Sequence, residues 1–401
     1  MLQDRRRTLA YKNAILGSKE EFAGKVVLDI GCGTGILSHF CVQAGARKVY
    51  AVDASNIADQ AKLIAEENGV ADKLVVIKGR IEEIELPEQV DIIVSEWMGH
   101  CLLYESMFDS VIVARDKWLR KDTGFLFPSH ASMFMAPFNE EDYYHEHVDY
   151  WNDVYGVKMT SVIPLAEKCF FREAEVAEID ACHLLGQDLL LKSFDLMTVT
   201  GEELREFSVP FSFLSYQINE LTGFCIWFDV KFETRQMTES IKSGRTDVRP
   251  VVLSTSPYEE PTHWMQTLLH IPATVSLFQD DPITGTIVVR SNPIHVNRKM
   301  LFSLSLDLYS FEEKPVKEED KAEIMKLMKK GRQNKYAALG KLDERIARWT
   351  VEMKVGKKGK KQAALNTKYN WTPGGVSKKE IEPPPALTTK CGSLQFDFEL
   401  E

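Results

Sequence analysis

The chain has 401 residues, of which 44% are hydrophobic, and it has a formal net charge of −10 and seven cysteines. Its length predicts two domains, and its composition excludes general disorder. It contains no apolar run of about twenty residues, so no segment is predicted to span a membrane. The cysteines are few, odd in number and without zinc-binding spacing. We therefore expect free thiols in an intracellular protein, and no metal site.

The charge is unevenly distributed. Residues 312–380 contain 19 Lys/Arg and 10 Asp/Glu, a surplus of +9, which leaves −19 on the rest of the chain. An acidic body favours basic partners and disfavours nucleic acids and anionic membranes. The basic segment 312–380 would instead favour acidic partners such as nucleic acids, but only at that segment.

Buried strands alternate with helices in the first third of the chain. The predicted strands are 26–30, 49–53, 74–78 and 90–95, and the predicted helices are 36–44 and 57–68. This alternation indicates a parallel sheet with helices on both faces, in a Rossmann-like domain over residues 1–127.

Strand-like runs dominate after Pro128. They lie at 132–136, 224–232, 286–290, 302–308 and 394–400, with clean period-two alternation at 302–308. We expect a second, antiparallel domain over 128–311 and 390–401. The less periodic stretch 150–191 suggests a projecting arm. Residues 312–389 are interpreted as a basic insertion, partly helical or disordered, between the last two strands.

A glycine loop follows the first strand. In Asp29-Ile30-Gly31-Cys32-Gly33-Thr34-Gly35, the three glycines let the backbone approach a ligand closely. A dinucleotide fingerprint would need glycine at position 36, where Ile36 stands. The loop is instead similar to the acidic-x-GxGxG loop of S-adenosylmethionine enzymes.

Two further acids follow the next strands. Asp53 ends the second strand, and its carboxylate suits two ribose hydroxyls. Glu82 follows the third strand, where an adenine would lie. The alternative is a purely structural turn with solvated loop acids, and the combination of loop, acid and element order favours cofactor binding.

A pair of glutamates flanks the loop after the fourth strand. Glu96, in Ser95-Glu96-Trp97-Met98-Gly99, lies at the carboxyl edge of the sheet, where ligands bind in open parallel sheets. Glu105 follows nine residues later. A guanidinium matches paired carboxylates because it is planar and offers a fork of donors. Taken singly, each glutamate is more simply a loop acid, but together with the glycine loop they favour methyl transfer to arginine.

Two motifs carry a family resemblance. Residues 95–99 with Tyr104-Glu105-Ser106-Met107 resemble the double-glutamate loop of the type I protein arginine methyltransferases, and Thr262-His263-Trp264 resembles that family's threonine-histidine-tryptophan loop. The resemblance runs from Met1 to about Phe311 and resumes at Cys391. Residues 224–230 and 253–264 most resemble the nuclear family member number six.

The resemblance implies a fold and an activity. The Rossmann-like domain is followed by a β-barrel with a helical dimerisation arm at about 150–185, and the protein is a head-to-tail homodimer. S-adenosylmethionine is the methyl donor and S-adenosylhomocysteine the product. The substrates are basic, arginine-bearing proteins such as histones, which give monomethyl and asymmetric dimethylarginine. The location is the nucleus or cytoplasm, with the nucleus favoured.

The resemblance also assigns roles to residues. Glu96 and Glu105 hold the substrate guanidinium, and His263 pairs with Asp4 and relays the proton. Arg7 binds the carboxylate of S-adenosylmethionine, alongside Asp29, Gly31, Gly33, Gly35, Asp53 and Glu82. The substrate pocket is formed by Met1, Trp97, Met98, Met107 and Trp264, with Met1 and Met107 flanking the substrate nitrogen.

The chain departs from the family pattern in several places. The family has a short helix that folds over the cofactor, and this sequence begins after it. Either the sequence is a fragment or the protein lacks this lid, and a chain without the lid is expected to bind the cofactor weakly and to turn over slowly. His100 stands where many relatives have tyrosine, and Asp53 is one methylene shorter than the usual glutamate.

These departures keep other interpretations open. One is a catalytically weak S-adenosylmethionine-binding scaffold, and another is a small-molecule methyltransferase, which has no need of paired glutamates. We interpret the insertion as a solvated loop; a nuclear-import signal or a nucleic-acid contact are the alternatives.

Overall fold

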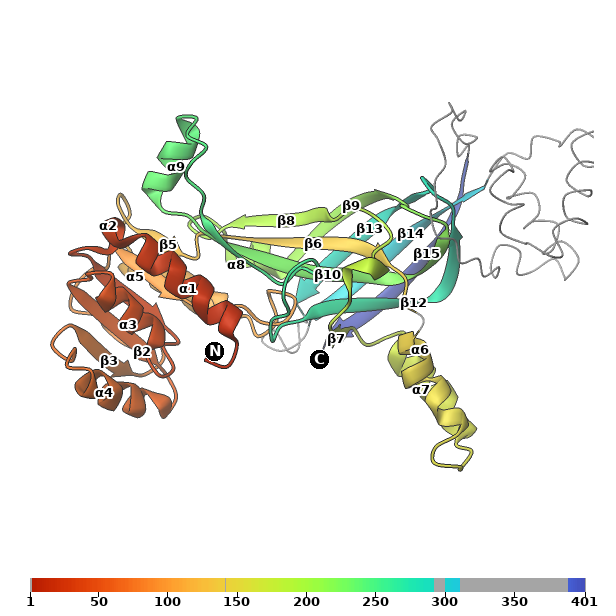
Figure 1. Cartoon of the computed structure of the whole chain (residues 1–401), viewed down its shortest axis with the longest axis horizontal. Coiled ribbons are helices and arrows are strands. Elements are labelled where there is room, and N and C mark those ends of the chain that lie inside the picture. The colour runs from red at the N-terminus through yellow and green to blue at the C-terminus, as the bar shows by residue number, and fades with distance from the viewer. Residues whose placement is uncertain (1, 141, 292–299, 311–388, 401) are drawn as a thin grey trace, which may run out of the picture.

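The first part of the chain forms a five-stranded parallel sheet (Figure 1). The computed structural model describes residues 2–140, 142–291, 300–310 and 389–400. The strand order is β3-β2-β1-β4-β5, with bounds β1 (Val26–Ile30), β2 (Lys48–Asp53), β3 (Leu74–Lys78), β4 (Ile92–Ser95) and β5 (Phe125–Phe127). The order reverses between β1 and β4, so the carboxyl ends of these two strands lie side by side at the switch point where ligands bind.

Helix α1 (Arg5–Gly17) joins the two parts of the molecule. It begins at its N-cap Asp4, whose carboxylate accepts the Arg7 N–H at 2.9 Å. It packs on α3 and also on β11 (Val251–Ser254) of the second part. The other helices of the first part are α2 (Lys19–Phe22), α3 (Ile36–Gln43), α4 (Ile57–Glu67) and α5 (Phe108–Trp118).

The second part consists of two antiparallel sheets. The larger has the order β7-β12-β10-β6-β8, with β11 on β10: β6 (His130–Phe138), β7 (Glu175–Ala177), β8 (Leu189–Asp195), β10 (Asn219–Phe232), β12 (Gln266–Leu277). The smaller has the order β15-β14-β13-β9: β9 (Glu206–Leu214), β13 (Pro282–Ser291), β14 (Met300–Ser310), β15 (Thr389–Leu400). Their apolar faces pack together, with the Phe211 and Phe224 rings 5.3 Å apart. The predicted combination of a Rossmann-like part and an antiparallel part is confirmed.

Two helical segments project from the second part (Figure 1). The arm consists of α6 (Asp142–His147), the 3-10 turns η1 (Asp149–Asn152) and η2 (Thr160–Val162), and α7 (Ile163–Phe170). On the other side, α9 (Arg235–Lys242) projects between β10 and β11. A short α8 (Gly201–Arg205) connects β8 and β9, and η3 (Ala181–His183) precedes β8.

Two predicted boundaries need correction. The arm was expected at about 150–185, but its helices begin at Asp142, and Glu175–Ala177 already pairs with β12 as strand β7, where the sheet satisfies its backbone groups. The insertion was expected to end at 389, but Thr389 pairs with Ser310 as the first residue of β15. The rest of the insertion lies outside the described residues. None of the described helices has the length and apolarity to cross a membrane.

Candidate active site

The glycine loop after β1 folds around the carboxylate of Asp53. Gly31, Gly33 and Gly35 have φ angles of 72°, 53° and 84°, which glycine adopts without steric cost. The Gly33 N–H donates to Asp53 Oδ2 at 2.9 Å, and Oδ1 accepts from the N–H and hydroxyl of Ser55 at 2.8 and 2.7 Å. The structure therefore brings together the predicted loop and the predicted acid at the end of β2.

The loop leaves room for a ligand on its outer side. A Cβ atom at Gly33 would meet no atom within 4 Å, and Gly31 is exposed. The methyl group of Met107 lies so close to Gly31 that a Cβ atom there would clash with it. An open backbone surface with a carboxylate beside it fits S-adenosylmethionine, which the glycine loop and Asp53 would hold.

Asp29 and Glu82 occupy different environments from Asp53. Asp29 is fully buried, and the Ser38 hydroxyl of α3 donates to its Oδ2 at 2.6 Å. Burial raises the pKa of Asp29 to about 7, although the hydrogen bonds from Ser38 oppose this shift. Glu82 is exposed and accepts from the Ser110 hydroxyl at 2.5 Å. Asp29 thus anchors α3 beneath the loop, and the cofactor contacts of both acids stay predictions.

One cluster of charged side chains joins α1, the end of β4 and the loop before β12. Arg7 Nη1 donates to Glu96 Oε2 at 2.9 Å and lies 3.2 Å from His263 Nε2. The guanidinium carbon is 5.1 Å from the ring centroid of Trp264, a cation–π arrangement. Arg7 was predicted to bind the carboxylate of the cofactor; in the structure its guanidinium lies on Glu96. A carboxylate, an imidazole and an indole face therefore form a cradle that holds a guanidinium.

The carboxylate of Glu96 is buried but incompletely satisfied. The side chains of Arg7 and Glu96 are 8% and 16% exposed. Glu96 Oε1 and Arg7 Nε have no hydrogen-bond partner among the described residues. Burial raises the pKa of Glu96 to about 7, and the charge of Arg7 opposes that shift. A free, buried carboxylate oxygen is therefore available to a further cationic donor.

His263 is oriented by Asp4. Its Nδ1 lies 2.7 Å from Asp4 Oδ2, and its backbone N–H donates to the same oxygen at 3.2 Å. Because a guanidinium has no acceptor, the contact with Arg7 requires an unprotonated Nε2, so that Nδ1 carries the proton and donates to Asp4. Burial and the charge of Arg7 lower the pKa of His263, and the hydrogen bond to Asp4 only partly offsets them. His263 is therefore poised to accept a proton at Nε2.

Two tryptophans and Met98 stiffen the walls of the site. The indole N–H of Trp264 donates to the Met98 carbonyl at 3.0 Å. Trp97 is 3% exposed and packs on Phe108, with ring centroids 4.5 Å apart. The Met98 sulfur lies 3.7 Å from the Tyr11 hydroxyl, so its side chain is directed toward α1. These residues hold the loop after β4 against the second part.

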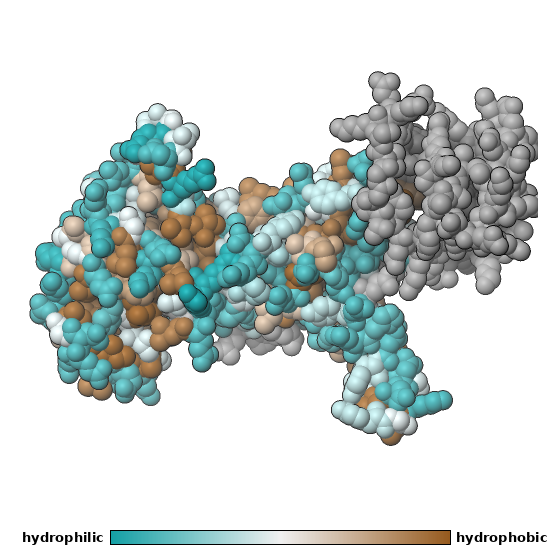
Figure 2. Space-filling model, viewed as in Figure 1, coloured by the Kyte–Doolittle hydropathy of each residue, from teal (hydrophilic) through white to brown (hydrophobic). Residues whose placement is uncertain are grey.

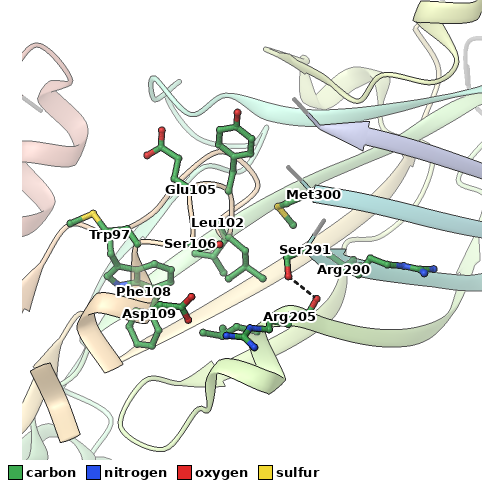
Figure 3. Close-up of a pocket in the computed structure, with 15 residues that line it drawn as sticks. Trp97, Leu102, Glu105, Ser106, Phe108, Asp109, Arg205, Arg290, Ser291 and Met300 are labelled. Atoms are coloured by element: carbon green, nitrogen blue, oxygen red, sulfur yellow. Dashed lines mark hydrogen bonds between the residues drawn. The ribbon is translucent and has the colours of Figure 1, made fainter. Parts of the chain in front are cut away.

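Glu105 lies on the same loop but apart from the cluster. Its side chain is exposed, and no hydrogen bond or ion pair in the described part of the chain involves it. The loop backbone is unusual, since Cys101, Leu102, Glu105 and Ser106 all have positive φ angles of 49–77°. Figure 3 shows the Glu105 carboxylate directed away from the neighbouring pocket. Its pairing with Glu96 on one guanidinium stays a prediction.

Some residues that position the site were not predicted. The Tyr11 hydroxyl donates to the Ser95 carbonyl at 2.9 Å, and the Ser95 hydroxyl donates to the Ile30 carbonyl at 2.9 Å. These bonds tie α1 to β4 and β4 to β1. The available signal was helical spacing, because Tyr11 follows Arg7 by four residues and shares its helix face. Met1, predicted to line the substrate pocket, lies outside the described residues.

Comparisons with known proteins agree with this geometry. Residues 129–312 match the arginine methyltransferase oligomerization subdomain, and residues 15–113 match ribosomal protein L11 methyltransferase. The chain is 44% identical over 313 residues to probable protein arginine N-methyltransferase 6.2 of Oryza sativa subsp. indica, covering 74% of this chain and 79% of the relative. It is 42% identical over 291 residues to protein arginine N-methyltransferase 6 of Danio rerio, covering 72% and 79%.

Solved structures show the same fold. The Trypanosoma brucei PRMT1 enzyme-prozyme heterotetrameric complex with AdoHcy matches with a TM-score of 0.68 and 35% identity, over 77% of this chain and 92% of that one. Arabidopsis thaliana protein arginine methyltransferase 10, in an open conformation, matches with a TM-score of 0.66 and 34% identity, over 79% and 93%.

The fold and the site together define an S-adenosylmethionine-dependent protein methyltransferase. A glycine loop with its acid lies at one strand end, and a guanidinium-binding carboxylate lies at the next. The chain belongs to the protein arginine N-methyltransferase family, within which it is most like member 6. It transfers methyl groups from S-adenosylmethionine to arginine.

Proposed function

We propose that this protein is a type I enzyme, which forms monomethyl and asymmetric dimethylarginine in basic proteins such as histones. The type I assignment rests on the resemblance of residues 95–99 and 104–107 to the type I enzymes, and the observation that carries arginine as the substrate is the cradle around Arg7. A buried carboxylate, a histidine nitrogen and an indole face already hold one guanidinium there. A substrate arginine presents the same group, and Glu96 Oε1, which has no partner among the described residues, is available to it beside Arg7.

Glu96 has the central role in this proposal. Its carboxylate accepts guanidinium N–H groups and draws positive charge toward the nitrogen that it contacts, so that another nitrogen becomes richer in electrons. Glu105, from the same loop, supplies the second carboxylate. S-adenosylmethionine, when bound, supplies the electrophilic methyl group. Positioning of the nucleophilic nitrogen is then the main requirement of the reaction.

His263 accepts the proton that the substrate nitrogen loses. Nε2 is unprotonated and lies in the cradle, while Nδ1 is held by Asp4. Asp4 is kept ionised: burial alone would raise its pKa, but the hydrogen bonds from Arg7 and His263 hold it below its usual value. An ionised Asp4 stabilises the imidazolium that forms.

A second copy of this chain is the proposed assembly partner. The arm exposes Tyr155 and Leu165, at 97% and 62%, and Figure 2 shows hydrophobic surface at its end and on the parallel-sheet part. On the parallel-sheet part, Leu63 of α4 is 49% exposed. Packing of each arm on the parallel-sheet part of the other copy would cover both surfaces and give a head-to-tail homodimer.

We also propose that the protein acts mainly in the nucleus. The proposal rests on its resemblance to the nuclear member of the family and on the basic composition of residues 312–380. Imaging of a tagged full-length chain, beside a variant with Lys357–Lys361 deleted, tests it. Exclusion of the intact chain from the nucleus would contradict it.

The type I assignment is tested by product analysis. The full-length chain is incubated with S-adenosylmethionine and an arginine-bearing histone tail, and the hydrolysed product is separated chromatographically. We expect monomethylarginine followed by asymmetric dimethylarginine. Symmetric dimethylarginine, or monomethylarginine alone at long times, would contradict the assignment. Cofactor binding without any transfer would favour the scaffold interpretation.

A further inference from the structure

A histidine bridges the two loops that form the cradle. The glutamate loop (residues 96–107) lies between β4 and α5 and carries the two predicted glutamates. The histidine loop (residues 255–265) lies between β11 and β12 and carries the proton acceptor. His100 of the glutamate loop is half-buried, and its Nδ1 lies 3.2 Å from the carbonyl oxygen of Trp264 in the histidine loop. Because a carbonyl oxygen only accepts, Nδ1 carries a proton and donates it to this bond.

This bond is one of two that run in opposite directions between the loops. The indole N–H of Trp264 donates to the Met98 carbonyl at 3.0 Å, and the carbonyl of Trp264 accepts from His100. Trp264 is 2% exposed, so both of its contacts lie away from bulk water. One hydrogen bond leaves rotation about itself free, whereas two bonds to different atoms also fix orientation. The pair therefore clamps the backbone and the ring of Trp264 to the glutamate loop.

The glutamate loop has a strained backbone that an external contact helps to hold. Leu102 and Glu105 have φ angles of 66° and 77°, which side-chain-bearing residues rarely adopt. The Gly99 N–H donates to the Leu102 carbonyl at 3.0 Å, and a Cβ atom at Gly99 would clash with the Tyr104 carbonyl. His100 lies inside this tight turn. Strained conformations persist where their surroundings constrain them, and the bond from His100 is such a constraint.

The clamped tryptophan also sets the position of the proton acceptor. His263 directly precedes Trp264, and their ring centroids are 4.1 Å apart. His263 Nε2 and Glu96 Oε2 lie 3.2 Å and 2.9 Å from the same atom, Nη1 of Arg7. A shift of Trp264 would therefore move His263 relative to Glu96, and small displacements of reacting groups are costly in rate.

We infer that His100 is a positioning residue, which holds His263 in register with Glu96 through the carbonyl of Trp264. The inference rests on the roles proposed above for Glu96 and His263. Nδ1 donates in both the neutral and the charged ring, so the bond needs no proton transfer by His100. Tyrosine, which the family resemblance places at this position, carries its donor at the far end of its ring. The clamp therefore belongs to the histidine of this chain.

Two amides separate positioning from other roles of His100. In His100→Asn the amide nitrogen is as many bonds from Cα as Nδ1, so the donor is kept, whereas His100→Gln places it where Nε2 lies. With the full-length chain and an arginine peptide, we expect kcat of His100→Gln to fall by about three- to tenfold, the equivalent of one hydrogen bond. The KM for the peptide and the affinity for S-adenosylhomocysteine should stay within about twofold, because Glu96 and the glycine loop are untouched.

The asparagine variant and a second histidine provide the controls. His100→Asn should stay within about twofold of wild type in kcat and keep the shape of its pH profile. His183 Nδ1 also contacts a backbone carbonyl, that of Asn139 at 3.1 Å, but outside the two loops. His183→Gln should therefore leave kcat within about twofold of wild type.

The inference is overturned if His100→Asn and His100→Gln lose kcat equally, or if neither loses it. It is also overturned if the loss lies in affinity for S-adenosylhomocysteine. An altered acid limb in His100→Asn would instead make His100 a proton-transfer group. Hydrogen exchange of residues 96–107 and 262–265 tests the clamp without activity and should be faster in His100→Gln alone. If wild type methylates no arginine peptide, the proposed function fails, and equal exchange in all variants would remove the clamp as well.

Discussion

Two carboxylates at strand ends show how differently the molecule uses a buried charge. Glu233 follows β10, where its oxygens accept from the Lys231 ammonium and from the Thr238 hydroxyl at 2.7 Å. Burial alone would raise its pKa, but these partners hold it below its usual value. Glu96 follows β4, and its one ion pair leaves Oε1 without a partner among the described residues. Burial raises the pKa of Glu96 to about 7.

The difference separates a structural acid from a functional one. Glu233 has local partners and contributes its charge to the fold. Glu96 is left short of donors at the carboxyl edge of the parallel sheet, where a ligand can complete its set. Removing each carboxylate should therefore change a different property, and these two residues serve as controls for one another.

The largest expected effect comes from Glu96→Gln. The amide keeps the shape but loses the charge that holds and polarises a guanidinium, so kcat/KM for an arginine peptide should fall by about 100- to 1,000-fold. Radiolabelled methyl transfer measures it. Glu233→Gln should remain within about threefold of wild type. The comparison fails if both variants lose activity equally or if Glu96→Gln stays active.

The pH dependence is the next largest effect. Glu96 must be ionised to accept a guanidinium, and its pKa is raised to about 7. kcat/KM should therefore rise with pH and level off above about 7, with a fall of about tenfold per unit below it. His263 must also be unprotonated. Because its pKa is lowered, its protonation adds to the loss of kcat/KM only at the acid end of the profile. A flat profile between pH 5.5 and 8 would contradict the assignment.

For the free energy of unfolding, the order of the two variants should be reversed: Glu233→Gln should have the larger effect. Glu233→Gln removes a charged acceptor from Lys231 and Thr238, so the free energy of unfolding at pH 7 should fall by about 1–3 kcal/mol. Because the folded-state pKa of Glu233 is depressed, this difference is present above the ordinary glutamate pKa and disappears as the pH falls through the depressed value. Denaturant melts at pH 7 and pH 3 measure it. Equal stability of the variant and wild type at pH 7 would show that Glu233 is not structural.

The smallest effect is expected for Trp264→Phe. Phenylalanine keeps an aromatic face over Arg7 but loses the hydrogen bond to the Met98 carbonyl. The free energy of unfolding should fall by about 1 kcal/mol, measured by denaturant titration. Affinity for S-adenosylhomocysteine should stay within about threefold of wild type, because Trp264 belongs to the cradle and not to the glycine loop. A large loss of that affinity would remove the distinction between the two subsites.

Sequence reasoning reached the parallel part of the fold with most success. The strand 74–78 and the start of the helix at Ile36 have the observed bounds, because buried parallel strands are continuous apolar runs and the glycine loop marks where a helix begins. Helix α1 was not predicted. The helix begins with three arginines, which gives no apolar helical pattern at its start. It is stabilised by packing on α3 and β11, and such long-range contacts leave no signal in the local sequence.

The site divides in the same way. The glycine loop, Asp53 and Glu96 follow from element order, because parallel strands end at one edge. The ion pair of Arg7 with Glu96 joins residues 89 positions apart and depends on where α1 packs, so no local signal could predict it. The unsatisfied oxygen of Glu96 is likewise a property of the packed structure.

The most direct test of the account is the affinity of an arginine-bearing peptide for the complex with S-adenosylhomocysteine, measured by calorimetry for wild type, Glu96→Gln and Glu233→Gln. The account predicts that Glu96→Gln weakens peptide binding by about ten- to 100-fold, the equivalent of one charge-assisted hydrogen bond, while Glu233→Gln leaves it unchanged. Equal peptide affinity in wild type and Glu96→Gln would contradict the claim that Glu96 holds the substrate guanidinium.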